Sequence, residues 1–394
     1  MSDVGVVARG IRTPIIRTGD NLSQIVVDSI LKSSLSDNFT FDNRDIVAVT
    51  EAVVGISQGN YATLNQIVRD IQYKFETKHI GVVFPILSRN RFANILRAIA
   101  RAMDKVTILL SYPKDEVGNS ILYPSDLERL NINPYDTIID ESTYEKELSH
   151  FKHPFTGVNM MHYYKELVES ENCVVEFVFS NQAKDILKYT KEVLVCDIHT
   201  RQETKHTLNK LDAQNVLGLD DILNRSVEGS GYNPSYGLYG SNAAGMEMVK
   251  LFPHNHDPIV YDIQKLFKEK TGKNIEVMIY GDGAFKDPVG GIWELADPVV
   301  SPSYTDGLEG TPNEIKLKYM TDDKYKHLAG EALKKAIFDE IAHKSNNVTD
   351  ETKLGTTPRR YVDLIGSLCD LVTGSGDKGT PVVYIKNYFK NITE

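Results

Sequence analysis

The stretch Glu276–Lys316, EVMIYGDGAFKDPVGGIWELADPVVSPSYTDGLEGTPNEIK, opens as a buried strand and continues as a long loop. Its apolar run Val277–Tyr280 ends abruptly at Gly281-Asp282-Gly283. Long loops in compact domains are functional or disordered, and the apolar residues of this loop argue against disorder. The loop is rich in carboxylates, which are Asp282, Asp287, Glu294, Asp297, Asp306, Glu309 and Glu314. This pattern predicts either a site for a hard cation such as Mg²⁺ or Mn²⁺ or a solvated acidic loop.

The bulk composition is that of a soluble globular protein with 394 residues, enough for two or three domains or one domain with a large insertion. A net charge of −10 argues against sequence-independent nucleic-acid binding, although a local basic pocket still allows a nucleotide. Cys173, Cys196 and Cys369 are far apart, so we expect buried reduced thiols. No signal peptide or membrane span is visible, which predicts a cytoplasmic protein without nucleic-acid or membrane partners.

Helices and strands alternate between residues 62 and 111. The apolar spacing predicts helices over 62–76 and 91–103, and buried strands over His79–Pro85 and Val106–Ser111. Such alternation is typical of a parallel sheet covered by helices. We therefore expect an α/β fold of mixed α+β type.

The expected elements divide the chain into a core and an insertion. Residues 62–205 form the inserted α/β unit, and residues 1–61 and 206–394 form the core. Within the core, a first strand is expected over residues 4–7. A helix over 258–270, stopped by Gly272, leads into the strand that opens the acidic loop.

Two segments of the insertion carry polar side chains at strand ends. Ser88-Arg89-Asn90-Arg91 lies between an expected strand and helix, where arginines and helix-terminal amides receive an anion or simply form an ordinary solvated cap. Asp197, His199 and Arg201 alternate onto one face of an extended segment. These three residues bind a carboxylate or a metal, or they form a structural ion pair.

The segment Gly374-Ser375-Gly376-Asp377-Lys378-Gly379-Thr380 is rich in glycine and offers backbone amides to an anion. A strand follows it and the residue order is wrong for a Walker A loop, so a plain glycine-rich hairpin is the alternative. Arg359 and Arg360 follow a Gly-Thr-Thr-Pro turn and can clamp a phosphate or carboxylate. An acidic loop beside glycine-rich loops suggests metal-dependent nucleotide chemistry.

Three segments together resemble the γ-glutamyl ligases of the deazaflavin coenzyme F-420 pathway. Thr13–Leu22, followed by Asp45–Gly59, is similar to the entry loop and second strand of that family. Gly237–Asn242 resembles its Gly-Ile-Asp-x-Ser-Asn loop, and Gly281-Asp282 falls on its Asp-Thr metal motif. The third segment, Gly374–Pro381, is similar to a loop that holds nucleotide and metal. The chain is thus identified as a divergent member with a large insertion.

The resemblance implies a ligase that activates an acceptor carboxylate with GTP as an acyl phosphate and joins it to L-glutamate. The acceptor is F-420-0 or another carboxylated cofactor, such as a folate. A divalent cation, Mg²⁺ or Mn²⁺, and a homodimer are also implied. The expected catalytic residues are Lys378 and Arg359, and the expected metal ligands are Asp282 and Asp287. The expected nucleotide-binding residues are Thr13, Pro14, Ile15, Ile16, Ser241, Asn242, Gly374, Ser375, Gly376, Asp377 and Gly379.

The chain departs from the family pattern at several ligand positions. A metal-binding Asp falls on Tyr239, a metal-binding Glu on Ser375, and a nucleotide-binding Lys on Ile56. Asp287, Glu294 or Asp297 of the acidic loop are candidate replacements. Two alternatives therefore stay open: a metal-dependent phosphate-handling hydrolase or transferase on the same fold, and a non-catalytic nucleotide-binding sensor.

Overall fold

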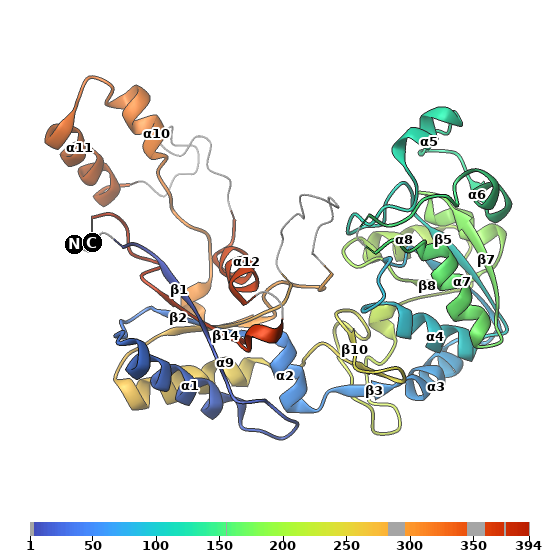
Figure 1. Ribbon diagram of the computed structural model, residues 1–394, viewed down its shortest axis with the longest axis horizontal. Helices are drawn as coiled ribbons and strands as arrows, with labels where there is room; N and C mark the ends of the chain where they lie inside the picture. The colour runs from blue at the N-terminus through green and yellow to red at the C-terminus, as the bar shows by residue number, and fades with distance from the viewer. Residues whose placement is uncertain (1–3, 155, 283–295, 345–358, 374–375, 394) are drawn as a thin grey trace.

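The computed structural model describes residues 4–154, 156–282, 296–344, 359–373 and 376–393. The chain forms two lobes, each built around its own sheet, and short segments near β3 (Tyr61–Thr63) connect them (Figure 1). The fold is mixed α/β, as the sequence predicts. None of the described helices has the length and apolar character needed to cross a membrane.

The first lobe contains a five-stranded sheet in the order β1-β14-β2-β12-β13. These strands are β1 (Val7–Ile11), β14 (Val382–Lys386), β2 (Ile46–Thr50), β12 (Glu276–Tyr280) and β13 (Ser303–Tyr304). Only β2 and β12 run parallel to each other, and Thr50 pairs with Tyr280 at their carboxyl ends. The first strand begins at Val7 rather than at residue 4, because the ladder with β14 pairs Val7 with Lys386.

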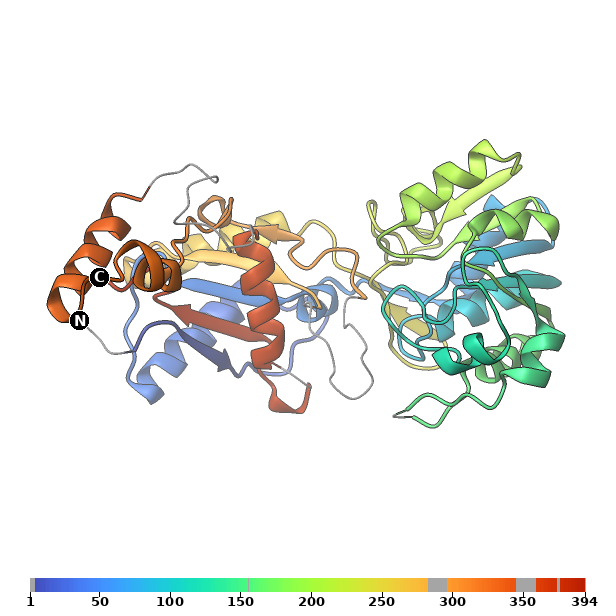
Figure 2. The ribbon, with the colours of Figure 1, turned by 90° about the horizontal axis from the view of Figure 1, so that it is seen from above.

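Alternating residues of β2 and β12 supply the two faces of this sheet. Val47 and Val277 face helices α1 (Leu22–Asp37) and α9 (Asp257–Thr271). Ala48 and Met278 face the opposite side, which α12 (Tyr361–Thr373) covers, and Figure 2 shows this red helix lying across the sheet. Helices thus cover both faces of the sheet and leave the ends of its strands accessible to a ligand.

The second lobe contains a six-stranded sheet in the order β6-β7-β5-β4-β8-β9. All strands except β6 are parallel. The strands are β4 (His79–Val83), β5 (Lys105–Leu110), β6 (Ile139–Asp140), β7 (Val174–Phe179), β8 (Glu192–Val195) and β9 (Asn215–Gly218). The chain starts in the middle at β4, moves to β5 and β7, and then returns to β8 and β9. This is the doubly wound order, whose reversal point lies between β4 and β8.

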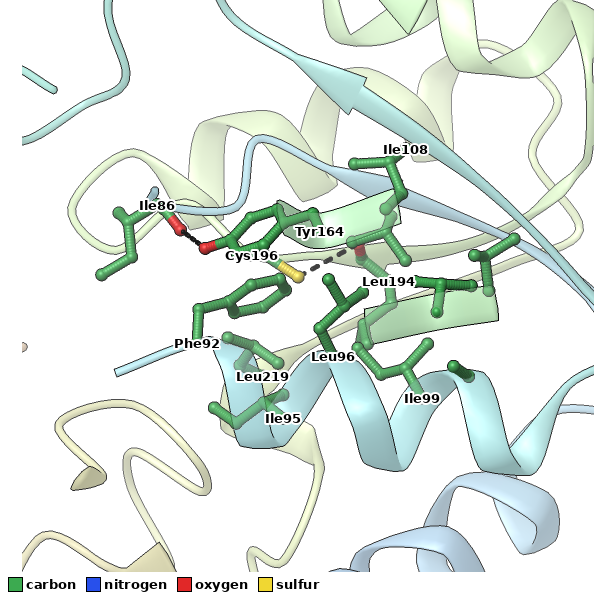
Figure 3. Packing of buried hydrophobic residues seen from close by; sticks show 14 of the residues in the cluster. Ile86, Phe92, Ile95, Leu96, Ile99, Ile108, Tyr164, Leu194, Cys196 and Leu219 are labelled. Carbon is green, nitrogen blue, oxygen red and sulfur yellow. Dashed lines mark hydrogen bonds between the residues drawn. The ribbon is translucent and has the colours of Figure 1, made fainter. Parts of the chain in front are cut away.

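Helix α4 (Ala93–Ala102) anchors the core of this lobe. Its apolar face meets the β8 region, and Figure 3 shows Phe92, Ile95 and Ile99 facing Leu194 and Leu219. The hydroxyl of Tyr164 donates to the carbonyl of Ile86 at 2.7 Å. This packing fixes the segment between β4 and α4, where Arg91 lies.

The remaining elements pack against the two sheets and their helices or connect the lobes. The sheet of the second lobe extends through β9, which lies beyond residue 205, and the domain limits stay a prediction.

The three cysteines are free and buried, as expected for reduced thiols. Other elements are α2 (Glu51–Gln58), α3 (Leu64–Lys74), α5 (Pro124–Arg129), α6 (Glu141–Glu147), α7 (Met160–Ser170), α8 (Arg201–Lys210), β10 (Asn242–Ala243), β11 (Met248–Lys250), α10 (Leu317–Tyr319) and α11 (Gly330–Ala342).

Candidate functional site

A cavity of about 350 Å³ lies where the carboxyl ends of β12 and β4 approach each other. Asp282 follows β12 in the first lobe, and Ser88, Asn90 and Arg91 follow β4 in the second lobe. Asn242 also lines the cavity. Ligands of open α/β sheets bind outside the carboxyl ends of the strands, so this position is a candidate site.

Arg91 is the central contact between the lobes. Its Nη1 donates to Asp297 Oδ1 at 2.7 Å and to the carbonyl of Gly240 at 3.1 Å, and its Nη2 contacts Asp282 Oδ2. The backbone N–H of Asp282 donates to Asp297 Oδ2 at 2.7 Å. Glycine at position 281 allows this close approach, because a Cβ there would lie 2.2 Å from Asp297 Oδ2 and would force its carboxylate to shift. The carboxylate of Asp297 is thus fully engaged, whereas Asp282 faces the cavity.

Burial and charge act on the pKa values of this cluster. Burial and the neighbouring charge of Asp297 raise the pKa of Asp282 to about 7, although Arg91 opposes the shift. Burial opposes the charge on Arg91, but Asp297 and Asp282 outweigh it and raise the pKa of the guanidinium. Arg91 therefore stays charged, whereas the charge on Asp282 responds to pH near neutrality.

A second buried ion pair lies beside this cluster. Lys250 Nζ, at the end of β11, is 2.9 and 3.2 Å from the carboxylate oxygens of Glu51, the first residue of α2. Burial raises the pKa of Glu51, and the charge of Lys250 opposes that shift. This pair joins the end of β2 to the segment that carries Gly240 and Asn242.

A further cavity of about 470 Å³ lies inside the first lobe and is mainly apolar. The loop Thr13–Ile16 forms one wall, Gly379–Pro381 forms another, and Ala52, Val53 and Ile56 of α2 line it as well. The pairing of β1 with β14 brings the first two walls together, and the N–H of Thr13 donates to the carbonyl of Gly379 at 3.4 Å. Such a slot suits a flat ring more than a highly charged group.

The comparisons with known proteins now identify the family. A model of the F420-0:gamma-glutamyl ligase family matches residues 10–387. The chain belongs to this family. The match confirms the resemblance derived from the three segments and supports a ligase. No match is found among curated proteins.

The nucleotide-binding residues expected from the family divide between the two cavities. Thr13, Pro14, Ile15, Ile16 and Gly379 line the apolar cavity of the first lobe. Asn242 lines the charged cavity beside Asp282, and Ser241 is buried next to it without a hydrogen-bond partner for its hydroxyl among the described residues. Gly374 and Ser375 lie outside the described residues.

The two expected catalytic residues lie far apart. Gly376, Asp377 and Lys378 form a short 3₁₀ turn, in which Lys378 is exposed and directly precedes Gly379 of the apolar cavity. Arg359 is exposed and precedes the first residue of α12, whereas Thr373 at the other end of this helix lines the cavity. A helix of 13 residues is about 20 Å long. The structure therefore places only Lys378 next to this cavity.

The metal site implied by the family can be compared with the described residues. Asp282 contacts Arg91, both carboxylate oxygens of Asp297 accept hydrogen bonds from the protein, and Asp287 lies outside the described residues. Among the residues that the structure describes, no group of three or more His, Cys, Asp or Glu side chains is arranged to hold a metal ion. The described residues thus do not form a metal-ion site at Asp282, and the divalent cation stays a prediction of the resemblance.

Other candidate residues have structural partners. Asp197 is buried and accepts from the hydroxyls of Thr200 and Thr204 at 2.6 and 2.8 Å. The Nε of Arg201 lies 3.4 Å from Asp220. These contacts favour the structural alternative for this segment. Tyr239, the position of a family metal ligand, is buried and donates to the carbonyl of Asp197 at 2.7 Å.

Sequence reasoning singled out Arg91 but missed its partners. Asp297 is 206 residues away from Arg91, and Lys250 is 199 residues away from Glu51. No local pattern pairs residues at such distances. The one available signal was Asp297 itself, as a surplus carboxylate in the acidic loop.

Proposed function

We propose that the protein is a GTP-dependent ligase that joins L-glutamate to the carboxylate of F420-0 or of a similar cofactor. Family membership over residues 10–387 is the observation that carries this proposal. The two cavities support it, since a ligase has to bind a nucleotide and an amino acid close together.

The cavities lie at neighbouring strand ends. Thr50 lines the apolar cavity and pairs with Tyr280, which lies two residues before Asp282 of the charged cavity. Neighbouring strands are about 4.8 Å apart. A nucleotide base in the apolar cavity can therefore extend its phosphates toward Asp282 without crossing the lobe.

The reaction proceeds in two balanced steps. An oxygen of the acceptor carboxylate attacks the γ-phosphorus of GTP, the bond to the β-phosphate oxygen breaks, and GDP leaves. The amine of L-glutamate then attacks the acyl carbon and loses a proton as inorganic phosphate departs. Lys378 is exposed and directly precedes Gly379 of the apolar cavity, and we propose that it supplies positive charge for the nucleotide phosphates as they leave this cavity.

Phosphate release measured with and without L-glutamate tests the proposal. A ligase releases phosphate only when GTP, the acceptor and L-glutamate are all present, and mass spectrometry then shows one added glutamyl residue on the acceptor. Release that does not depend on L-glutamate would instead support a phosphate-handling hydrolase or transferase. Nucleotide binding without any turnover would support the non-catalytic sensor, for which the buried Tyr239 at a family metal position is the specific observation.

A further inference from the structure

The charged cavity is built where the carboxyl ends of two sheets meet. Asp282 comes from the end of β12 in the first lobe, and Ser88, Asn90 and Arg91 come from the segment after β4 in the second lobe. In the second lobe β4 borders the reversal point of a doubly wound sheet, which is the usual ligand position in such sheets. Both lobes thus direct their ligand-binding edges at the same space.

The ion pairs of the described residues around this space leave one carboxylate without a cation of its own. Two carboxylates, Asp282 and Asp297, contact one guanidinium, Arg91, while Glu51 and Lys250 pair with each other. One carboxylate is therefore in surplus. Asp297 is fully buried, whereas the side chain of Asp282 is 31% exposed, so the surplus charge is accessible at Asp282. An ammonium group is the complementary ligand group.

Arg91 supplies a position for an anionic group in the same cavity. Its contacts with the described residues use Nη1 and Nη2, and Nε has no partner among them. Arg91 lines the cavity beside Ser88, Asn90, Asn119 and Asn242, whose hydroxyl and amide groups are neutral donors and acceptors. Such a lining suits carboxylates that need hydrogen bonds and one full positive charge.

The volume of the cavity and the positions of its charged side chains match a small zwitterion. About 350 Å³ lies at the lower end of the range of about 300–1,000 Å³ for small-molecule pockets. The ammonium-binding side, Asp282, belongs to the lobe with the apolar cavity, and the carboxylate-binding side belongs to the other lobe. A ligand held in this way presents its amine toward the lobe where the nucleotide is proposed to bind.

We propose that this cavity is the amino-acid subsite, in which Asp282 binds the ammonium group of L-glutamate and Arg91 binds its α-carboxylate. The inference rests on the proposed function and adds the position of the amino acid. Because Arg91 contacts Asp282 in the free protein, the ligand inserts between the two side chains. Arg91 keeps its contact with Asp297 and so holds the second lobe in place.

Calorimetry with three ligands tests the subsite without relying on turnover. L-Glutamate carries both recognised groups, glutarate lacks the ammonium group, and 4-aminobutyrate lacks the α-carboxylate. We expect both analogues to bind the wild-type protein at least about 10-fold more weakly than L-glutamate, since each loses a charge-assisted hydrogen bond. The titrations are done with a non-hydrolysable GTP analogue present, so that an ordered binding sequence does not hide the amino acid.

Two variants assign the two ends of the ligand. Asp282→Asn keeps the shape of the side chain and should lower the affinity for L-glutamate by about 10-fold. Glutarate and L-glutamate should then bind this variant with affinities within about twofold of each other. Arg91→Lys keeps the charge but loses the fork of donors, and should raise the KM for L-glutamate by about 10-fold with the KM for GTP unchanged. Arg89→Lys is the matched control, because Arg89 is exposed two residues away, and it should change both constants less than about twofold.

The outcomes separate the subsite from the reaction. A protein that ligates L-glutamate with the same KM in wild type, Asp282→Asn and Arg91→Lys overturns the subsite and leaves the proposed function intact. If the ligands bind with the expected relative affinities but no amide forms, the result supports the subsite and contradicts the proposed function. A protein that neither binds nor ligates L-glutamate overturns both.

Discussion

The apolar cavity and the charged cavity differ in what encloses them. The apolar cavity is formed within the first lobe by Thr13–Ile16, Gly379–Pro381 and α2, which backbone pairing brings together. The charged cavity is formed between the lobes, and the ion pairs of Arg91 hold it. The first depends on one folded sheet, whereas the second depends on how two sheets face each other.

The proposed roles of the two cavities follow from this difference. An apolar slot within one sheet binds a ring through buried area, and single charges matter little there. A charged cavity between lobes suits a small polar ligand. Its buried ion pairs cost desolvation free energy, which is offset only when each buried charge has a partner of opposite charge. Changes in the two cavities should therefore affect different substrates.

The largest expected effect is on stability, from Arg91→Ala. This change leaves the fully buried Asp297 without its cation, and losing one partner of a buried pair costs about 3–5 kcal/mol. Urea unfolding of Arg91→Ala and of the exposed control Arg89→Ala measures the effect, and the control should stay within about 0.5 kcal/mol of wild type. Equal stability of the two variants would show that Arg91 does not hold the lobes.

Filling the apolar cavity should give the next largest effect. Ala52 lines this cavity on α2, and Ala52→Trp places a ring where the nucleotide base is proposed to lie. We expect the KM for GTP to rise by at least about 10-fold, because the tryptophan ring fills space that the base would occupy. The KM for L-glutamate should stay unchanged. Ala332→Trp on the exposed face of α11 is the control. An unchanged KM for GTP in Ala52→Trp contradicts the assignment of this cavity.

A smaller and more specific effect separates the two expected catalytic residues. Lys378 directly precedes a residue of the apolar cavity, whereas Arg359 lies at the far end of α12. Lys378→Ala should lower kcat by about 100-fold, as for the loss of one group that stabilises transition-state charge, and Arg359→Ala by less than twofold. Steady-state rates at saturating substrates measure both. A larger loss in Arg359→Ala would reverse the assignment.

The smallest effect is on the pH dependence of stability at Asp282. Burial raises the pKa of this carboxyl from its ordinary value to about 7 in the folded protein, so the unfolded chain ionises first. A raised folded pKa means that this contribution to stability is fully present below the ordinary carboxyl pKa of 3.8 and is lost as pH rises from there through 7. Asp282→Asn removes this decline. The Tm of the variant should match wild type only near pH 4, exceed it increasingly between about pH 4 and pH 7, and exceed it by a constant few degrees near pH 8; a constant difference from pH 4 to pH 8 would contradict the account.

Much of the first lobe was predictable from local patterns. The apolar runs of β2, β12 and β14 and the amphipathic helix α9 are visible in the sequence, and Gly272 ends α9 with a φ of 72°, as its position predicts. The family resemblance predicts Thr13–Ile16 as a nucleotide-binding loop, and the structure places this loop against Gly379.

The charged cavity was less predictable, for a physical reason. The sequence predicts an anion site or a cap at Ser88–Arg91 and a metal ligand at Asp282, but nothing local shows that Arg91 contacts Asp282 across 191 residues. Contacts between lobes depend on how folded units face each other, which periodicity and capping do not encode. The same limit hid the pairing of Glu51 with Lys250.

The central claim is that the chain activates a carboxylate with a nucleotide and transfers it to L-glutamate. An acceptor labelled with ¹⁸O in its carboxylate tests this most directly, because the first step makes a carboxylate oxygen the bridge to phosphorus. The account predicts that one ¹⁸O atom appears in the released phosphate, and only when L-glutamate is present. Phosphate that carries no label, or that is released equally without L-glutamate, would contradict it.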